Sequence, residues 1–199
     1  MSRKTALRRA FVLAASCSLV ASAMVAATPA NAADTPKTGG VLQLLEHEPR
    51  LDHLDPTRIY TGRDLAFMNS FVTRTLVAYN PVPGPNGASL VPDLATNTGV
   101  PSNAAKTWKF TLRSGIKWED GSPVTCADVA YGVSRPFAAD VITDGPQYLV
   151  QALDIPKDKD GSSAYKGPYK KTGQALYDKA VVCKGNTITF HLNRSFADF

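Results

Sequence analysis

Apolar and polar residues alternate one by one in the middle of the chain, which indicates a strand with one buried face. Trp108, Phe110 and Leu112 are the apolar members of this alternation. A Ser-Gly pair interrupts the pattern, and residues 116–118 resume it. The run Glu-Asp-Gly-Ser-Pro at 119–123 is rich in turn residues, so we expect the second strand segment to end there.

The pattern becomes helical after this turn. Thr125 has the position of a helix N-cap, and Asp128 completes a Thr-x-x-Asp capping box three residues later. We expect the helix to end near Arg135, because Pro136 has no N–H group to donate to an intrahelical hydrogen bond. Strand, turn and capped helix therefore follow one another within about thirty residues.

The same patterns predict several further elements on both sides of this stretch. On the N-terminal side we expect a buried strand at 39–45 and then a core helix that begins with a second capping box at Thr61 and Asp64. The apolar side of this helix carries Phe67, Met68, Phe71, Val72, Leu76 and Tyr79, and an exposed turn at 81–87 between two short strands follows it. On the C-terminal side we expect a partly helical stretch at 137–153, a long exposed insertion at 154–171, a short helix at 175–180, and two final strands at 181–183 and 187–192. Trp118, like Trp108, is expected to pack in or beside the core.

The excess of basic over acidic residues lies almost entirely in the first residues of the chain. The sequence has 22 basic and 17 acidic residues, but four of the basic ones lie in the first nine positions and no acidic residue precedes Asp34. The rest of the chain holds 18 basic and 17 acidic residues and has no basic stripe. We therefore expect no nucleic-acid partner.

The first 32 residues have the three regions of a secretory signal peptide. A basic start is followed by an apolar run at 11–27 and by an Ala-x-Ala site that ends at Ala32. The sequence predicts export and cleavage after Ala32, and thus a location outside the cytoplasm. Two alternatives stay open at this point: the apolar run could be a membrane anchor, or Cys17 could carry a lipid.

Removal of a signal peptide would leave two cysteines, Cys126 and Cys183. An even number of cysteines in an exported chain predicts a disulfide, which would stabilise a loop of this length by about 4 kcal/mol in the chain-entropy model. The alternative is two separate buried thiols. No histidine lies near Cys126 in the sequence, which argues against a nucleophilic cysteine.

Two arrangements of residues could carry chemistry other than simple binding. Ser114 and Lys117 form a Ser-x-x-Lys motif, and Lys-Thr-Gly occurs at 37–39 and 171–173, which together suggest a serine acyl-transferase or hydrolase of the penicillin-binding type. Against this, the motif contains a glycine and lies between strand segments rather than on a helix.

A loop with two histidines and four carboxylates could also hold a divalent metal, although charged loops are more often simply solvated. Its members are Glu46, His47, Glu48, Asp52, His53 and Asp55.

A series of short motifs occurs in order along the chain. They are Leu-Asp-Pro at 54–56, Pro-Asp-Leu-Ala at 92–95, Trp-Lys-Phe-Thr-Leu-Arg at 108–113, Gly-Ile-Lys-Trp at 115–118, Asp-Gly-Ser-Pro-Val-Thr at 120–125, Asp-Val at 128–129, Thr-Ile-Thr-Phe-His-Leu at 187–192 and Phe-Ala-Asp-Phe at 196–199. This series resembles the bacterial extracellular solute-binding proteins of family 5, which comprise the peptide-, oligopeptide- and nickel-binding receptors of ABC importers.

The resemblance implies a mixed α/β fold of the periplasmic-binding-protein-like type II class. Such receptors have two lobes that close over a ligand without catalysis. Because family members are much longer, the chain is expected to be an N-terminal fragment: a signal peptide at 1–32, the start of the lobe I core at 33–78, and a nested α+β subdomain of lobe I at 79–199, with the second lobe absent.

The resemblance also implies a function and a binding segment. The chain is expected to be an exported, monomeric solute-binding protein for peptides or other small solutes, which docks on a membrane ABC permease. No catalytic residue, metal or cofactor is expected. The ligand contacts in this part of the family fold follow the first strand, and Glu46, Arg50 and Asp52 are the predicted contacts to a peptide amine or carboxylate.

Overall fold

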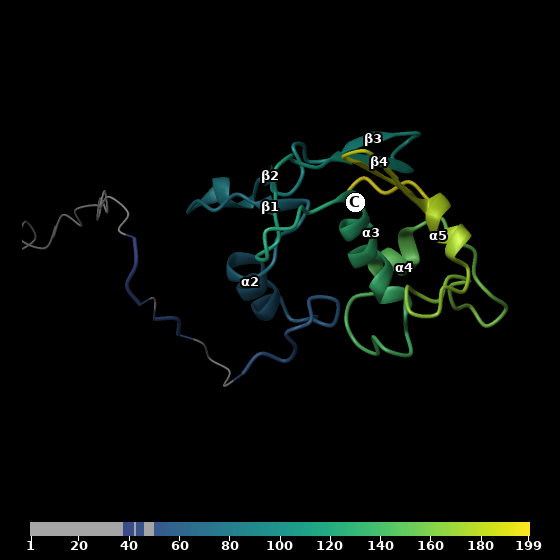
Figure 1. Cartoon of the computed structure of the whole chain (residues 1–199), viewed down its shortest axis with the longest axis horizontal. Helices are drawn as coiled ribbons and strands as arrows, with labels where there is room; N and C mark the ends of the chain where they lie inside the picture. The colour runs from purple at the N-terminus through teal and green to yellow at the C-terminus, as the bar shows by residue number, and fades with distance from the viewer. Residues whose placement is uncertain (1–37, 42, 46–49) are drawn as a thin grey trace, which may run out of the picture. The chain divides into compact units, whose positions relative to one another are not determined.

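The computed structural model describes residues 38–41, 43–45 and 50–199 (Figure 1). The chain divides after Leu45, and the account below concerns the unit from residue 46 onward. Within the described ranges no helix is long and apolar enough to cross a membrane. The predicted signal peptide at 1–32 lies outside the described residues and stays a prediction, as does the domain boundary at 78/79.

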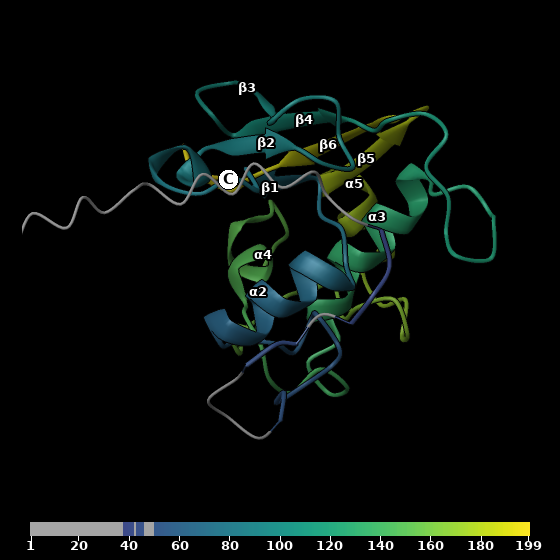
Figure 2. The ribbon, with the colours of Figure 1, turned by 90° about the vertical axis from the view of Figure 1, so that its left-hand side faces the viewer.

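A four-stranded antiparallel sheet is the centre of this unit. Its strands lie in the order β3 (Val100–Ser102), β4 (Thr107–Thr111), β6 (Thr187–His191) and β5 (Val181–Lys184). Figure 2 shows these strands as one layer, with helices beneath it. The predicted strand around Trp108 and the predicted pair of final strands are thus confirmed.

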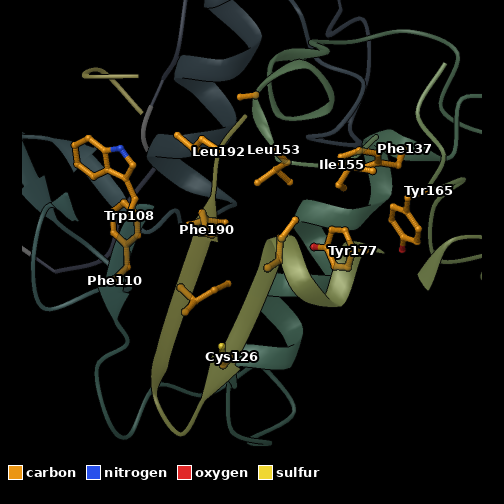
Figure 3. Packing of buried hydrophobic residues seen from close by; sticks show 14 of the residues in the cluster. Trp108, Phe110, Cys126, Phe137, Leu153, Ile155, Tyr165, Tyr177, Phe190 and Leu192 are labelled. Atoms are coloured by element: carbon orange, nitrogen blue, oxygen red, sulfur yellow. The ribbon is translucent and has the colours of Figure 1, made fainter. Parts of the chain in front are cut away.

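The inner face of the sheet is built by cross-strand apolar pairs. Trp108 is opposite Phe190 and Phe110 is opposite Ile188, so the period-2 alternation of both strands turns the same face inward. All four side chains are buried. Two helices contact this part of the sheet, α3 (Cys126–Ser134) and α5 (Gln174–Ala180). Figure 3 shows the resulting core from close by.

The segment 154–171, which was predicted to be a long exposed insertion, is exposed over much of its length but is anchored in this core at two residues. Ile155 and Tyr165 are buried, Tyr165 to 1% exposure. The Tyr165 ring stacks on Tyr177 at a centroid distance of 4.6 Å and also contacts Phe137 (Figure 3). The prediction missed these two anchors, because two apolar side chains among many polar ones are enough to hold an irregular segment against the protein.

The helix α3 begins and ends where the sequence predicted. The Thr125 side chain accepts the Asp128 N–H, and the Asp128 carboxylate accepts the Thr125 N–H at 2.7 Å, which completes the capping box. The α-helix stops at Arg135, and a 3-10 turn, η2 (Arg135–Phe137), contains Pro136. Two shorter predicted helical stretches are also present, as α4 (Tyr148–Ala152) and α5.

A disulfide joins the start of α3 to the edge strand β5. Cys126 and Cys183 are bonded, with their Cα atoms 5.8 Å apart and 57 positions apart in the sequence. Cys126 is buried while Cys183 is exposed. The covalent link therefore fixes the capped end of the helix against the edge of the sheet.

The helix near the N-terminal side of the unit is shorter than predicted. The helix α2 spans Gly62–Phe71, and the chain then turns into β1 (Val77–Tyr79). The N–H groups of Val72 and Thr73 both bond to the Met68 carbonyl, which ends the helix. Leu76 and Tyr79 fit the helical spacing by coincidence, because both lie at or beside the strand β1 and not in the helix. Met68 is buried and Leu76 packs against the core, whereas Phe71 is 55% exposed, so only part of the predicted apolar face is a core face.

The predicted turn at 81–87 is confirmed. It contains the 3-10 turn η1 (Pro85–Ala88) and joins β1 to β2 (Leu90–Pro92) in a separate two-stranded antiparallel sheet. Three prolines restrict the backbone of this connection, which is exposed.

Two predicted strand segments do not form. Residues 38–41 and 43–45 lie in no strand. Lys117 makes only an isolated bridge to Pro123, and Trp118 is 52% exposed rather than packed in the core. The Asp120–Ser122 turn folds the chain back before a ladder can develop.

We predict that removal of the disulfide lowers the free energy of unfolding by about 4 kcal/mol, because the unfolded chain regains the entropy of a long open loop. The double variant Cys126→Ser/Cys183→Ser should show this loss in urea unfolding followed by circular dichroism. A reducing agent should destabilise the original chain equally and leave the double variant unchanged. Equal unfolding midpoints for the original chain and the double variant would contradict the prediction.

Candidate functional site

The predicted binding residues lie in an irregular segment that precedes α2. The structure describes this segment from Arg50, and Glu46 lies outside the described residues. Arg50 and Asp52 are both exposed. Their role in ligand binding stays a prediction, but the structure shows how residues 50–60 are held, at three points along the segment.

The first attachment is the buried carboxylate of Asp64, in the first turn of α2. Asp64 has no exposed surface and accepts the Asp52 N–H at 2.9 Å and the Arg63 Nε–H at 2.7 Å. Arg63 Nη2 also donates to the Arg50 carbonyl at 3.4 Å. The Arg63 hydrogen bond, followed by that of the Asp52 amide, holds the pKa of Asp64 below its usual range although burial opposes this. The backbone of Arg50 and Asp52 is therefore fixed while their side chains remain in solvent.

This arrangement differs from the predicted second capping box. The Thr61 side chain does accept the Asp64 N–H, at 3.4 Å, so Thr61 is the N-cap of α2 as predicted. The Asp64 carboxylate, however, bonds to the preceding segment through the Asp52 amide. An acidic residue in the first helical turn can accept any N–H that tertiary packing brings to it.

The second attachment is a bidentate ion pair between Asp55 and Arg135. Arg135 Nη1 and Nη2 donate to the two Asp55 carboxylate oxygens at 2.9 and 2.5 Å, and Arg135 Nε donates to the Tyr169 hydroxyl at 3.1 Å. Both charged side chains are more than two-thirds buried. The Arg135 hydrogen bonds are the main reason that the pKa of Asp55 lies below its usual range.

The third attachment lies around Asp144 and Gly145. Arg58 Nη2 donates to the Asp144 carboxylate at 2.6 Å, and His53 Nε2 lies 3.7 Å from the same oxygen. Gly145 has a φ of +90°, and a Cβ atom at this position would lie 2.2 Å from the Thr57 carbonyl oxygen. The segment and the 144–145 turn are therefore in direct backbone contact.

These attachments hold the backbone of the segment but leave several of its side chains at the surface. Ile59 is fully buried, whereas Leu54 is 71% exposed and the side chains of Arg50 and Asp52 are in solvent. A fixed backbone that presents a guanidinium and a carboxylate can bind a zwitterionic ligand with little loss of conformational entropy.

Sequence reasoning missed most of the residues that build this arrangement. The sequence marked Asp55 only as part of the Leu-Asp-Pro motif and Arg135 only as the end of a helix. It did not predict their ion pair, because the two residues are 80 positions apart in the chain. Asp144 and Tyr169 were not singled out. The residue that could have indicated this pairing is Arg135, which lies at the end of a well-capped helix. Its guanidinium needs a hydrogen-bonding partner when it is mostly buried.

A separate hollow of about 490 Å³ lies beside α4. Its walls come from β1, β4, β6, α3, α4 and residues 194–199. They are mostly apolar and include Val77, Phe110, Val133, Leu149 and Phe199. Tyr148 connects the two regions, because it lines the hollow and also interacts with Tyr60 at the end of the fixed segment, an interaction that raises the pKa of Tyr148.

The acyl-transferase alternative finds no support in this geometry. Ser114 and Lys117 are exposed on a turn rather than on a buried helix, and the Ser114 hydroxyl only accepts a hydrogen bond from Asn186 at 3.3 Å. The acyl-transferase interpretation is therefore wrong, since it requires the serine at the start of a buried helix. The metal alternative stays a prediction, because Glu46, His47 and Glu48 lie outside the described residues. Within residues 38–41, 43–45 and 50–199 no group of three or more His, Cys, Asp or Glu could hold a metal ion.

Comparison with known proteins identifies the family. The model of the bacterial extracellular solute-binding proteins, family 5 Middle, matches residues 89–199. The chain is 41% identical over 69 residues to a probable peptide ABC transporter periplasmic-binding protein, y4tO, of Sinorhizobium fredii, which is 35% of this chain and 12% of that protein. It is 46% identical over 46 residues to the periplasmic murein peptide-binding protein MppA of Escherichia coli, which is 23% of this chain and 8% of MppA.

Solved structures agree with this assignment. Clavulanic acid biosynthesis oligopeptide binding protein 2 matches 75% of this chain and 26% of its own length, with 39% identity and a TM-score of 0.65. The E. coli murein tripeptide binding protein MppA shares the fold, with a TM-score of 0.52 over 73% of this chain and 25% of MppA. The mixed α/β fold of the periplasmic-binding class, present in part, is confirmed. The chain spans about a quarter of these two solved relatives.

We predict that Gly145→Ala destabilises the protein more than Gly161→Ala. Both glycines have positive φ, +90° and +82°, so both variants carry similar backbone strain. Only at Gly145 would the new methyl group meet a backbone carbonyl, while nothing lies within 4 Å of Gly161. Urea unfolding should show an additional loss of at least about 1 kcal/mol for Gly145→Ala. Equal losses would show that the segment 50–60 does not pack on this turn.

We also predict that Arg135→Gln lowers the free energy of unfolding at pH 7 by about 1–3 kcal/mol, because it leaves the Asp55 carboxylate without its partner. The folded-state pKa of Asp55 is lowered, so the contribution of the pair is complete above the unfolded-state value and is lost as the pH falls through the folded-state pKa. The gap between the variant and the original chain should therefore shrink in urea unfolding below about pH 4.

A matched control for this variant is Lys170→Gln. Lys170 Nζ lies 2.8 Å from the Asp140 carboxylate, but both side chains are about half exposed. Removal of such a surface pair should change the free energy of unfolding by less than about 0.5 kcal/mol. A loss for Arg135→Gln that is the same at pH 3 and pH 7 would mean that packing, rather than the ion pair, stabilises the segment.

Proposed function

Because the chain belongs to the bacterial extracellular solute-binding proteins of family 5, we propose that it acts in the capture of peptides for an ABC importer. The observation that supports this most directly is the 39% identity to an oligopeptide binding protein over three-quarters of the chain. The names of the other relatives also describe peptide binding. In this function the protein binds and releases its ligand without chemical change and uses no cofactor.

The proposed contacts are the side chains of Glu46, Arg50 and Asp52. Arg50 and Asp52 are exposed, and both have their backbone fixed through Arg63 and Asp64. A free peptide carries an amine at one end and a carboxylate at the other, so a carboxylate and a guanidinium on one fixed segment match its two termini. The rest of the ligand-binding surface belongs to the parts of the family fold that this chain does not span.

The proposed setting is extracytoplasmic. The sequence pattern at 1–32 supports export, and the relatives named above are periplasmic-binding proteins. The proposed partner is the membrane permease of the importer, and the chain acts as a monomer.

The proposal is tested by peptide binding with capped and uncapped termini. Fluorescein-labelled tripeptides with free or blocked ends are titrated with the purified chain, and fluorescence anisotropy gives the dissociation constants. Arg50→Ala should weaken binding of peptides with a free carboxylate about tenfold, and Asp52→Ala should do the same for peptides with a free amine. Blocking the corresponding peptide end should abolish the effect of each variant.

The control variant is Lys184→Ala, which removes an exposed charge on β5. It should leave all dissociation constants unchanged. If the chain binds none of these peptides, or binds capped and free peptides equally, the proposed function of this segment is refuted.

A further inference from the structure

The two halves of the disulfide differ in accessibility. Cys126 is only 5% exposed, and its sulfur lies 3.6 Å from the carbonyl oxygen of Thr187, at the start of β6. Cys183 is exposed. Thiol–disulfide exchange begins when a thiolate attacks one of the two sulfurs, and its rate depends on which sulfur the thiolate can reach. An incoming thiolate therefore meets this disulfide at Cys183.

The buried half of the disulfide is well placed to leave. Cys126 is the first residue of α3, directly after the Thr125 cap, where the positive end of the helix dipole stabilises a thiolate. The Asp128 carboxylate of the same turn opposes this, although the Thr125 N–H and hydroxyl donate to it. Once the Cys126 sulfur has taken up a proton, it can donate to the Thr187 carbonyl, so the reduced half keeps a partner.

The exposed half lies on a strand with an open edge. Among the described residues β5 is the last strand of the four-stranded sheet and pairs only with β6. The two strands are joined by a two-residue hairpin, and Lys184 and Thr187 are its closing pair. Since that pair is hydrogen-bonded in such a hairpin, the alternation of the ladder directs the N–H and C=O of Cys183 away from β6. These groups can pair with an extended segment of another protein.

We propose that Cys183 is the site at which a thiol–disulfide oxidoreductase of the Cys-x-x-Cys type engages this protein. The first thiolate of the reduced oxidoreductase attacks Cys183 Sγ and forms a mixed disulfide. The bond to Cys126 breaks, and Cys126 leaves as a thiolate that takes a proton from water. The second thiolate of the oxidoreductase then attacks its own first sulfur and releases Cys183. Two electrons pass to this protein, and the oxidoreductase keeps a disulfide.

The open strand edge is the reason for choosing a protein, rather than a small thiol, as the partner. Backbone pairing with β5 holds the attacking sulfur beside Cys183, an advantage that a small thiol lacks. The same encounter in reverse forms the disulfide, with Cys126 resolving the mixed disulfide, and the reduction potentials of the two proteins set the direction. Reduction frees the start of α3 from the sheet edge. The proposal does not depend on the peptide contacts proposed above.

The test is to trap the mixed disulfide on the unaltered chain. The oxidised chain is mixed with reduced thioredoxin in which serine replaces the second cysteine of the Cys-x-x-Cys motif, so that the mixed disulfide is not resolved. After an acid quench the freed thiols are alkylated, and mass spectrometry of the peptides identifies the cysteine that is joined to thioredoxin. The adduct at Cys183 should exceed that at Cys126 at least about tenfold.

Reduction rates distinguish a protein partner from a small thiol. Reduced thioredoxin and dithiothreitol are compared at equal thiolate concentration, both on this chain and on oxidised glutathione, which has a disulfide but no strand edge. The preference for thioredoxin over dithiothreitol should be at least about tenfold larger for this chain than for oxidised glutathione.

A matched pair of variants measures the accessibility of each thiol separately. Cys126→Ser leaves only the Cys183 thiol in the described part of the chain, and Cys183→Ser leaves only the Cys126 thiol there. Both lose the same covalent link. The Cys183 thiol should react with an aromatic disulfide reagent at least about tenfold faster than the Cys126 thiol. If either variant fails to fold, the trapping experiment on the unaltered chain still decides.

Three outcomes would overturn the proposal. An adduct mainly at Cys126 would place the attack at the buried half. An equal preference for thioredoxin on this chain and on oxidised glutathione would remove the role of the β5 edge. The absence of any mixed disulfide would show that the bond is inaccessible to such a partner. None of these outcomes bears on peptide binding.

Discussion

The pairing of β4 with β6 is the interaction on which the rest of this unit depends. It joins residues 107–111 to residues 187–191, and it sets the register that turns Trp108, Phe110, Ile188 and Phe190 to one face. A shift by one residue would turn these side chains outward and expose the core. The helix α3, the disulfide and the anchored segment 154–171 all lie between the two strands in sequence, so their positions follow once this pair has formed.

The candidate site depends on the same framework through the end of α3. The helix starts at a capping box and a disulfide, and it ends at Pro136, so the place of Arg135 is determined from both directions. From there Arg135 reaches Asp55 and Tyr169, which come from two other parts of the chain. A mostly buried guanidinium with three fixed hydrogen bonds holds a loop more firmly than an exposed ion pair could.

The sequence predicted those features that are encoded locally. The strands with strict alternation, the Thr125 cap, the helix end at Pro136 and the proline-rich turn at 81–87 each depend on neighbouring residues only. Long-range features were not predictable in this way. The residues around Asp55 do not indicate that Arg135 is its partner, and the residues around Gly145 do not indicate that Thr57 packs against it. The failure at Trp118 shows the limit of such patterns: apolar spacing reports that a residue can be buried, but burial requires a partner surface elsewhere in the fold.

The described residues of the candidate site divide into those that hold the segment and those that it presents. Asp55, Asp64 and Arg135 are largely or fully buried, so their replacement would leave charges without partners and would disturb the fold. Arg50, Asp52 and Leu54 are exposed, and the backbone of Arg50 and Asp52 is fixed by hydrogen bonds to Arg63 and Asp64 that other side chains at these two positions would also permit. Substitution at the presented positions should therefore cost little stability. A scaffold of this kind can change the charge and shape that it offers to a ligand while the segment that offers them stays in place.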